Sequence, residues 1–164
     1  MSIIKLNLYA LGPIALATLA TPVMAAEPVP SEFVGDWQST CDAWGVPATC
    51  TSRWQVGKHA SHLLQDYTIV SNADGAQIFA GRGLYRIVDG AVDGTWEDSR
   101  GEILSLAGQY SDGELKVIWG DASREIGRSI YSIAEAQLVA EDAVLTDAGW
   151  RVFMRIDYAR LDQE

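Results

Sequence analysis

The residues with the clearest potential for metal chemistry are His59 and His62, the only histidines in the chain. A His-x-x-His pair can supply two metal ligands, and Asp66 follows four residues later. Protein metal sites generally need at least three protein ligands, supported by further hydrogen bonds. If a strand covers residues 62–71, His59 lies outside it and the two rings have no reason to converge. We therefore expect a solvated surface pair and no metal site.

Carboxylates are concentrated between Gly94 and Glu102, which is the arrangement a glycosidase would need. Three of them, Glu97, Asp98 and Glu102, lie at or near the expected hairpin turn Asp98-Ser99-Arg100-Gly101, where acidic residues serve solubility. The chain has no Gly-x-Ser-x-Gly nucleophile motif and no phosphate-binding glycine loop. Gly81 and Gly83 fall inside an expected strand, where we interpret them as points of bending at a barrel corner. Catalytic residues therefore remain unassigned from the sequence.

Aromatic residues are the more informative set, because aromatic rings beside a cavity can hold an apolar or planar ligand while a few polar groups orient it. Ordinary core packing is the alternative for each ring taken singly. Arg128 is expected to point inward with Ile130, and a buried arginine requires a carboxylate or a ligand anion. Glu125 and Asp98 are its candidate protein partners. The candidate pocket residues are Trp54, Tyr67, Tyr85, Trp96, Tyr110, Trp119, Arg128 and Met154.

The two cysteines, Cys41 and Cys50, are close in sequence and flank a segment that contains Gly45 and Pro47. In an oxidising compartment such a pair predicts a disulfide, whereas redox-active pairs usually have Cys-x-x-Cys spacing. Loop-closure entropy assigns this cross-link about 2–3 kcal/mol of stabilisation. We therefore expect a structural disulfide.

Residues 1–26 have the composition of a cleavable signal peptide. Lys5 is their only charge, an apolar stretch follows from Leu6 to Ala20, and small residues end at Ala25 and Ala26. The apolar run is too short for a membrane-spanning helix, so we expect export to the periplasm or beyond and no stable membrane insertion after cleavage. Loss of Lys5 changes the net charge from −10 to −11. Such an acidic protein repels phosphate backbones, which argues against nucleic-acid binding.

The remaining residues, 27–164, are predicted to form one all-β domain. Short runs rich in Val, Ile, Tyr and Trp alternate with turns such as Asp89-Gly90 and Asp112-Gly113, which favour hairpins. We expect a single antiparallel up-and-down β-barrel of about eight to ten strands, with a two-sheet β-sandwich as the alternative. The expected strands are 33–40, 49–57, 62–71, 76–88, 91–98, 102–111, 114–120, 125–133, 136–145 and 149–160. In the last strand, alternation predicts that Trp150, Val152, Met154, Ile156 and Tyr158 share one face.

The start of this domain, Phe33-Val34-Gly35-Asp36-Trp37, resembles the Phe-x-Gly-x-Trp opening of fatty-acid-binding proteins and the Gly-x-Trp opening of lipocalins, the calycin group. The resemblance implies a barrel in which Trp37 plugs one end. It also implies that a basic residue of the final strand, Arg155 or Arg160, packs over this ring. The helical pair that fatty-acid-binding proteins insert after their first strand has no counterpart here. The haem-binding barrels of this shape use an axial histidine near the C-terminus, which this chain lacks, so we expect no cofactor.

Three functions are consistent with these patterns. The first is an exported protein that binds a small apolar or aromatic molecule in a barrel cavity. The second is a barrel enzyme, such as a cyclase, isomerase or lyase, that uses one acid–base residue of the pocket, with a tyrosine, Glu125 or Asp98 as candidates. The third is an envelope interaction or structural domain that uses its outer surface.

Overall fold

The chain folds into a closed antiparallel barrel of ten strands in the computed structural model, which describes residues 29–121, 123 and 125–161. The predicted signal peptide lies outside the described residues. A 3-10 turn, η1 (Ser31–Phe33), leads into the barrel. The strands are β1 (Gly35–Ala43), β2 (Val46–Val56), β3 (His62–Ser71), β4 (Gln77–Val88), β5 (Ala91–Asp98), β6 (Ile103–Ser111), β7 (Glu114–Gly120), β8 (Ile126–Ala134), β9 (Gln137–Thr146) and β10 (Gly149–Arg160).

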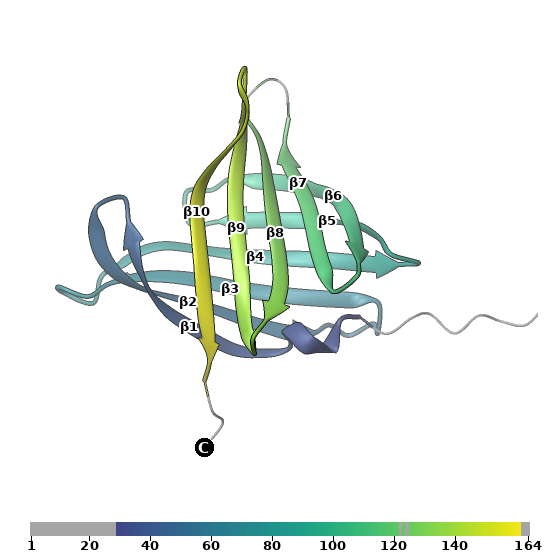
Figure 1. Cartoon of the computed structure of the whole chain (residues 1–164), viewed down its shortest axis with the longest axis horizontal. Coiled ribbons are helices and arrows are strands. Elements are labelled where there is room, and N and C mark those ends of the chain that lie inside the picture. The colour runs from purple at the N-terminus through teal and green to yellow at the C-terminus, as the bar shows by residue number, and fades with distance from the viewer. Residues whose placement is uncertain (1–28, 122, 124, 162–164) are drawn as a thin grey trace, which may run out of the picture.

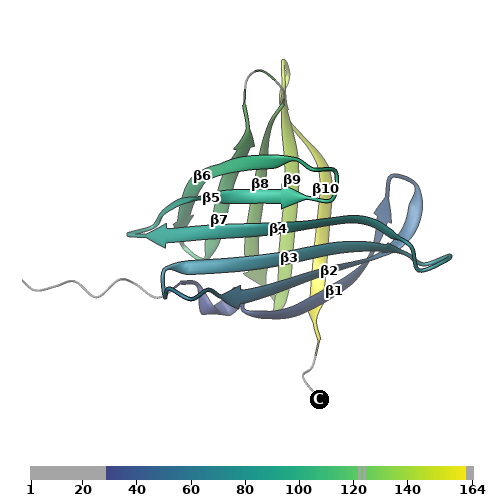
Figure 2. The same ribbon diagram turned by 180° about the vertical axis from the view of Figure 1, so that it is seen from behind.

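Each strand pairs with its neighbours in sequence, and β1 pairs with β10 to close the barrel. Figures 1 and 2 show this up-and-down order from opposite sides. The predicted all-β barrel is confirmed, and the two-sheet sandwich is not formed. Strands β3, β5, β7 and β10 have the predicted bounds. The segment 136–145, which has many good helix formers, is also a strand because its backbone pairs with β8 and β10 on both sides.

The turns follow the predicted chemistry. Asp89 and Gly90 have φ of 51° and 78°, and Asp112 and Gly113 have φ of 54° and 75°. Both residues of each turn are therefore left-handed, which matches the right-handed twist of the flanking strands and favours Asp-Gly at these places. These tight turns keep consecutive strands adjacent.

The contact between β1 and β10 is much shorter than the other strand pairings. Only Trp37–Arg160 and Gln38–Ala159 are in register, whereas β1 and β2 pair over nine positions from Gly35 to Ala43. Beyond Gln38 the β1–β2 hairpin bends away from β10, as Figure 1 shows at the left. The barrel is thus closed at one end of this seam and spread at the other.

A bulge in β10 reverses which side chains face inward. Val152 pairs with Ala143 and Met154 pairs with Asp142, so Phe153 is the additional residue. Met154, Ile156 and Tyr158 share the inner face as predicted, whereas Trp150 and Val152 are 39% and 48% exposed. The uniform alternation expected through residue 150 is therefore wrong before the bulge.

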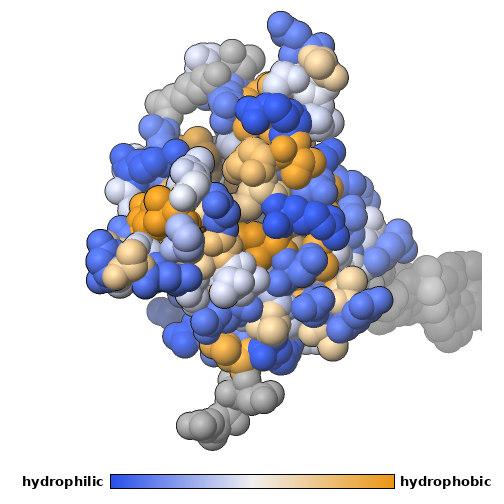
Figure 3. Space-filling view, turned by 60° about the vertical axis from the view of Figure 1, so that its left-hand side comes forward, coloured by the Kyte–Doolittle hydropathy of each residue, from blue (hydrophilic) through white to orange (hydrophobic). Residues whose placement is uncertain are grey.

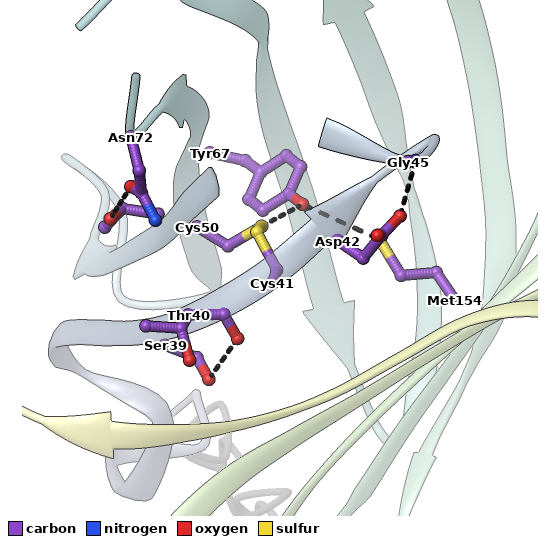
Figure 4. The surroundings of a disulfide bond; sticks show 10 residues. Ser39, Thr40, Cys41, Asp42, Gly45, Cys50, Tyr67, Asn72 and Met154 are labelled. Carbon is purple, nitrogen blue, oxygen red and sulfur yellow. Dashed lines mark hydrogen bonds between the residues drawn. A yellow bond between two sulfur atoms is a disulfide. The ribbon is translucent and has the colours of Figure 1, made fainter. Parts of the chain in front are cut away.

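The predicted disulfide between Cys41 and Cys50 is present and cross-links β1 to β2, with 6.0 Å between the Cα atoms. The hydroxyl of Tyr67 donates to Cys50 Sγ at 3.5 Å and also contacts Met154 Sδ at 3.8 Å (Figure 4). The disulfide therefore stiffens the hairpin that leaves the β1–β10 seam. A disulfide of this kind is compatible with an exported protein. Within the described residues, no helix has the length and apolarity needed to cross a membrane.

Candidate functional site

One end of the barrel interior is filled with side chains. Phe33 of η1, Trp37 of β1 and Trp54 of β2 are at most 2% exposed. The Trp54 ring stacks on Tyr85, with 5.4 Å between centroids, and meets Tyr131 edge-on at 5.0 Å. Aromatic pairs in these geometries pack well and leave little free volume. We call this the closed end.

The other end of the interior is hollow. A cavity of about 770 Å³ opens between the tips of the β1–β2, β5–β6, β7–β8 and β9–β10 hairpins. We call this the open end. Figure 3 shows patches of hydrophobic surface, bordered by hydrophilic residues, on the side of the molecule that carries the β1–β2 hairpin. The cavity wall is mostly apolar and aromatic, and includes Tyr67, Ile69, Phe79, Tyr85, Trp96, Leu104, Leu106, Val117, Trp119, Tyr131, Val144 and Met154.

Glycines create the space in which two tryptophans form this wall. A Cβ atom added at Gly81 would lie 2.0 Å from Trp96 Cζ2, and one added at Gly127 would lie 2.0 Å from Trp119 Cζ2. The two indoles therefore lie flat against glycine backbone. Gly83 makes room in the same way for the Tyr85 ring, whose Cε2 atom would be 2.6 Å away. Gly81 and Gly83, which the sequence indicated as points of bending, thus also provide room for close ring packing.

A carboxylate, Asp142 of β9, lines the cavity among these rings. It pairs with Ser129 of β8 on one side and with Met154 of β10 on the other, so all three side chains share the inner face. The Ser129 hydroxyl donates to Asp142 Oδ1 and accepts a hydrogen bond from Trp119 Nε1 at 3.1 Å. Trp119 and Ser129 therefore orient one oxygen of the carboxylate.

Burial raises the pKa of Asp142 to about 6; the Ser129 hydrogen bond opposes this rise and the charge of Glu141 adds to it. Burial likewise raises the pKa values of Tyr67, Tyr85 and Tyr131, and the negative charge of Asp142 raises each further. The side chains of these three tyrosines, which come from three other strands, are thus close enough to Asp142 for its charge to raise their pKa values. The cavity combines a proton-exchanging group with an aromatic wall, which is a typical feature of functional sites.

Charged residues of both signs surround the mouth of the cavity. Arg100 stacks over Phe79 at 5.3 Å and pairs with Asp98 at 2.8 Å. Arg151 occupies an inward position opposite Val144, and Asp42 and Glu125 also border the opening. The rim therefore has no strong excess of either sign. The inner carboxylate is the charge that a deeply bound ligand would meet.

The structure brings five of the eight predicted pocket residues together in the cavity wall: Tyr67, Tyr85, Trp96, Trp119 and Met154. Trp54 lies beneath them in the closed end. Tyr110 lies against Phe33 at the closed end, where its hydroxyl donates to Glu32 and its pKa is raised to about 12 by burial and by this partner.

Arg128 does not line the cavity. Ser129 and Tyr131 occupy the inward positions of β8, so Arg128 and Ile130 face outward, which corrects the expectation that they point inward. The Arg128 guanidinium pairs with Glu141 at 3.2 Å and lies over the Trp150 ring at 4.8 Å. Neither Glu125 nor Asp98 is its partner: Asp98 pairs with Arg100 at the end of β5, and Glu125 precedes β8 at the mouth of the cavity.

The closed end reproduces the packing that the opening motif implied. Trp37 Nε1 donates to the Phe33 carbonyl at 2.7 Å, and the guanidinium of Arg160 lies 4.5 Å from the Trp37 ring. Arg160 also donates to the Glu32 carbonyl at 3.1 Å. The basic residue over the tryptophan is therefore Arg160 and not Arg155, which pairs with Glu141 on the outer face.

The remaining candidates for chemistry lie outside the cavity wall. Asp98 accepts backbone hydrogen bonds from Arg100 and Glu102 within the β5–β6 turn, and although burial opposes it, these bonds and the Arg100 side chain lower its pKa. The rings of His59 and His62 are 5.0 Å apart. In residues 29–121, 123 and 125–161 no three potential metal ligands come together.

Sequence reasoning missed Asp142, Ser129 and Tyr131. A period-two pattern through Leu138, Ala140, Asp142 and Val144 was available as a signal, but the segment also has helix-forming residues. For Ser129 and Tyr131 the strand was identified and the inward face was assigned one residue out of step. A one-residue error of this kind moves every side chain of a strand to the opposite face.

The fold and the cavity define a class of protein: a closed ten-stranded up-and-down barrel with one filled end and one hollow end. A solved structure of similar shape is the "Crystal Structure of Rv2717c from M. tuberculosis", with 13% sequence identity and a TM-score of 0.59, covering 80% of this chain and 94% of that chain. At this identity the similarity shows a shared fold alone. No protein-family model matches the chain, and no curated protein matches it significantly.

Proposed function

We propose that this protein is an exported, calycin-like barrel that binds a small apolar or aromatic molecule in the cavity at its open end. The observation that carries the proposal is the cavity of about 770 Å³ with its aromatic wall. Ligand sites for small molecules typically enclose about 300–1,000 Å³ and combine apolar walls with a few oriented polar groups. Asp142 and Ser129 supply such groups here.

The closed end supports the calycin-like part of the proposal. Trp37 plugs the barrel under η1 and Arg160 packs over the ring, which is the arrangement that the Phe33-to-Trp37 motif implies. Export to the periplasm or beyond is supported by the composition of residues 1–26 and by the disulfide. The rigid closed end would hold the walls of the cavity apart in the absence of ligand.

The test is a fluorescence titration of the mature protein, residues 27–164, with the uncharged dye N-phenyl-1-naphthylamine. Binding in the cavity is expected to enhance dye emission to saturation at one site per chain. Val144→Trp places a large ring into the cavity wall and should abolish the enhancement. Leu145→Trp is the matched control, because Leu145 is 45% exposed on the opposite face of β9. Equal binding to both variants, or no saturable binding to the wild type, would contradict the proposal.

A second candidate function, catalysis by a single acid–base group, is favoured by Asp142. Its pKa of about 6 allows the side chain to accept and release protons near neutral pH, and Tyr131 and Tyr67 lie in the same cavity wall. A cyclase, isomerase or lyase of this kind would convert a bound ligand, whereas a binding protein would return it unchanged. Mass spectrometry of a ligand after incubation with wild type and with Asp142→Asn distinguishes the two.

A further inference from the structure

We infer that the cavity selects ligands with a protonated amine attached to an apolar or aromatic body, and that Asp142 is the residue that holds the amine. The inference rests on the proposed binding function and names the ligand class for the same site. It follows from the position of one carboxylate inside an aromatic wall and from the hydrogen bonds that fix it.

The hydrogen bonds at Asp142 leave acceptor capacity directed into the cavity. A carboxylate has about four lone-pair sites. Ser129 donates to Oδ1, and within the described chain no other side-chain donor bonds to either oxygen. The residues directly opposite, Ser129 and Met154, provide no positive charge. The oxygens are thus presented to whatever occupies the cavity.

Asp142 has no ion-pair partner among the described residues, although Arg100 and Arg151 line the mouth of the same cavity. In the part of the chain that the structure describes, no arginine, lysine or histidine forms an ion pair with it, whereas the neighbouring Glu141 on the outer face pairs with Arg128 and Arg155. Asp142 is partly buried, and a carboxylate that loses part of its hydration without gaining a cation is in an unfavourable position. A bound ammonium would supply both the charge and the hydrogen-bond donors that the site lacks.

The groups around the carboxylate also favour a cation. Tyr67 of β3, Tyr85 of β4 and Tyr131 of β8 face the same cavity and stay protonated, since burial raises their pKa values, so they add no competing charge. Trp96 and Trp119 complete the wall, and the faces of aromatic rings attract cations. The net charge of −10 further attracts cations toward the molecule from solution.

The experiment is competition against bound N-phenyl-1-naphthylamine with three compounds that share one ring system: 2-naphthylmethylamine, 2-naphthylmethanol and 2-naphthoate. At pH 7.5 the amine is expected to bind about tenfold or more tightly than the alcohol, in proportion to one charge-assisted hydrogen bond. The carboxylate compound should bind most weakly. In Asp142→Asn the advantage of the amine should fall to about twofold or less, with the affinity for the alcohol unchanged.

Asp157→Asn is the matched control, because Asp157 lies on the exposed outer face of β10 and its removal changes the net charge by the same amount. It should leave the order of the three compounds unchanged. Lowering the pH from 7.5 to 5 should also reduce the advantage of the amine in the wild type, since Asp142 becomes protonated while the amine stays charged.

Three outcomes separate the two proposals. Equal affinity for the amine and the alcohol, or an amine advantage that survives in Asp142→Asn, overturns the inference. If the dye still binds, the proposed function of the cavity in ligand binding is retained. Failure of dye and alcohol to bind at all overturns the binding function itself. Retained affinity of Asp142→Asn for the alcohol shows that this variant is folded, so a lost amine advantage supports the inference.

Discussion

The closed and open ends of this barrel are built from the same residue types but organise them differently. At the closed end the Trp54 ring packs against Phe33, Tyr85 and Tyr131, with centroids 5.0 to 5.6 Å apart. At the open end Trp96 and Trp119 lie flat against Gly81 and Gly127. The buried rings of Phe33, Trp37 and Trp54 fill the interior at the closed end, whereas Trp96 and Trp119 lie against the barrel wall at the open end and line the cavity.

Polar groups are also arranged differently at the two ends, although Trp54 Nε1 at the closed end has no hydrogen-bond partner among the described residues. Just above the closed end, Tyr85 donates to Gln65 Oε1 at 2.7 Å and Gln65 donates to Ser52 Oγ at 3.1 Å, so this buried network is satisfied within the protein. At the open end Asp142 receives only the Ser129 hydroxyl and lacks a cation within the described residues. The comparison indicates that the closed end provides stability and that the open end retains capacity for a ligand.

The largest expected effect is the loss of stability on emptying the closed end. Trp54→Ala removes a fully buried ring with three aromatic neighbours and should lower the free energy of unfolding by about 3–5 kcal/mol. Trp44→Ala, at the tip of the open-end hairpin and 72% exposed, should change it by about 0.5 kcal/mol or less. Urea denaturation followed by circular dichroism measures both, and similar losses would invalidate the division into two ends.

The second effect concerns the disulfide that stiffens the open-end hairpin. Replacing Cys41 and Cys50 together by alanine should lower the free energy of unfolding by about 2–3 kcal/mol, since the unfolded chain regains loop entropy. Amide exchange should increase most in β1 and β2 near the hairpin tip and least around Trp37. Uniform acceleration across the barrel would show that the two ends do not open independently.

The third effect is the pH dependence caused by Asp142. Its folded-state pKa of about 6 exceeds the usual 3.8, so the folded protein binds more protons than the unfolded chain between these values. The contribution of Asp142 to stability therefore decreases as the pH rises from 3.8 to about 6. Asp142→Asn removes this decrease and should raise the free energy of unfolding at pH 7 by about 1–2 kcal/mol.

Denaturation of wild type and Asp142→Asn at several pH values measures this difference, and the other titrating groups cancel in the comparison. A variant that is less stable than the wild type at pH 7 would show that Asp142 contributes to the fold. A variant that is more stable but binds amines poorly would assign Asp142 to function at the open end.

The smallest effect distinguishes the two arginines of β10. Arg160→Gln removes the cation over Trp37 at the closed end and should lower the free energy of unfolding by about 1 kcal/mol. Arg155→Gln breaks only an exposed pair with Glu141 and should change it by less than about 0.5 kcal/mol. A larger loss for Arg155→Gln than for Arg160→Gln would contradict the assignment of Arg160 as the residue that packs over Trp37.

The sequence predicted the strands well because their signals are local. Asp89-Gly90 and Asp112-Gly113 prescribe left-handed turns through the backbone preferences of these residues, and strand-forming side chains fill the intervals. The disulfide was predictable because Cys41 and Cys50 are close in sequence and flank a segment that contains Gly45 and Pro47. Trp37 was identified by its place in a short motif at the first strand.

The candidate site was predicted in part, and its chemistry depends on tertiary structure. Tyr67, Tyr85, Trp96 and Trp119 reach the cavity because their strands alternate regularly near them, and Met154 reaches it at the position after the bulge. Arg128 and Trp150 face outward because inward orientation depends on the register of β8 and on the bulge at Phe153, which are set by pairing with β9. Asp142 acquires its raised pKa only when the strands close around it and exclude water. Local sequence preferences thus determined the elements of this barrel, whereas strand register and closure decided which side chains enclose a cavity and which charge lies inside it.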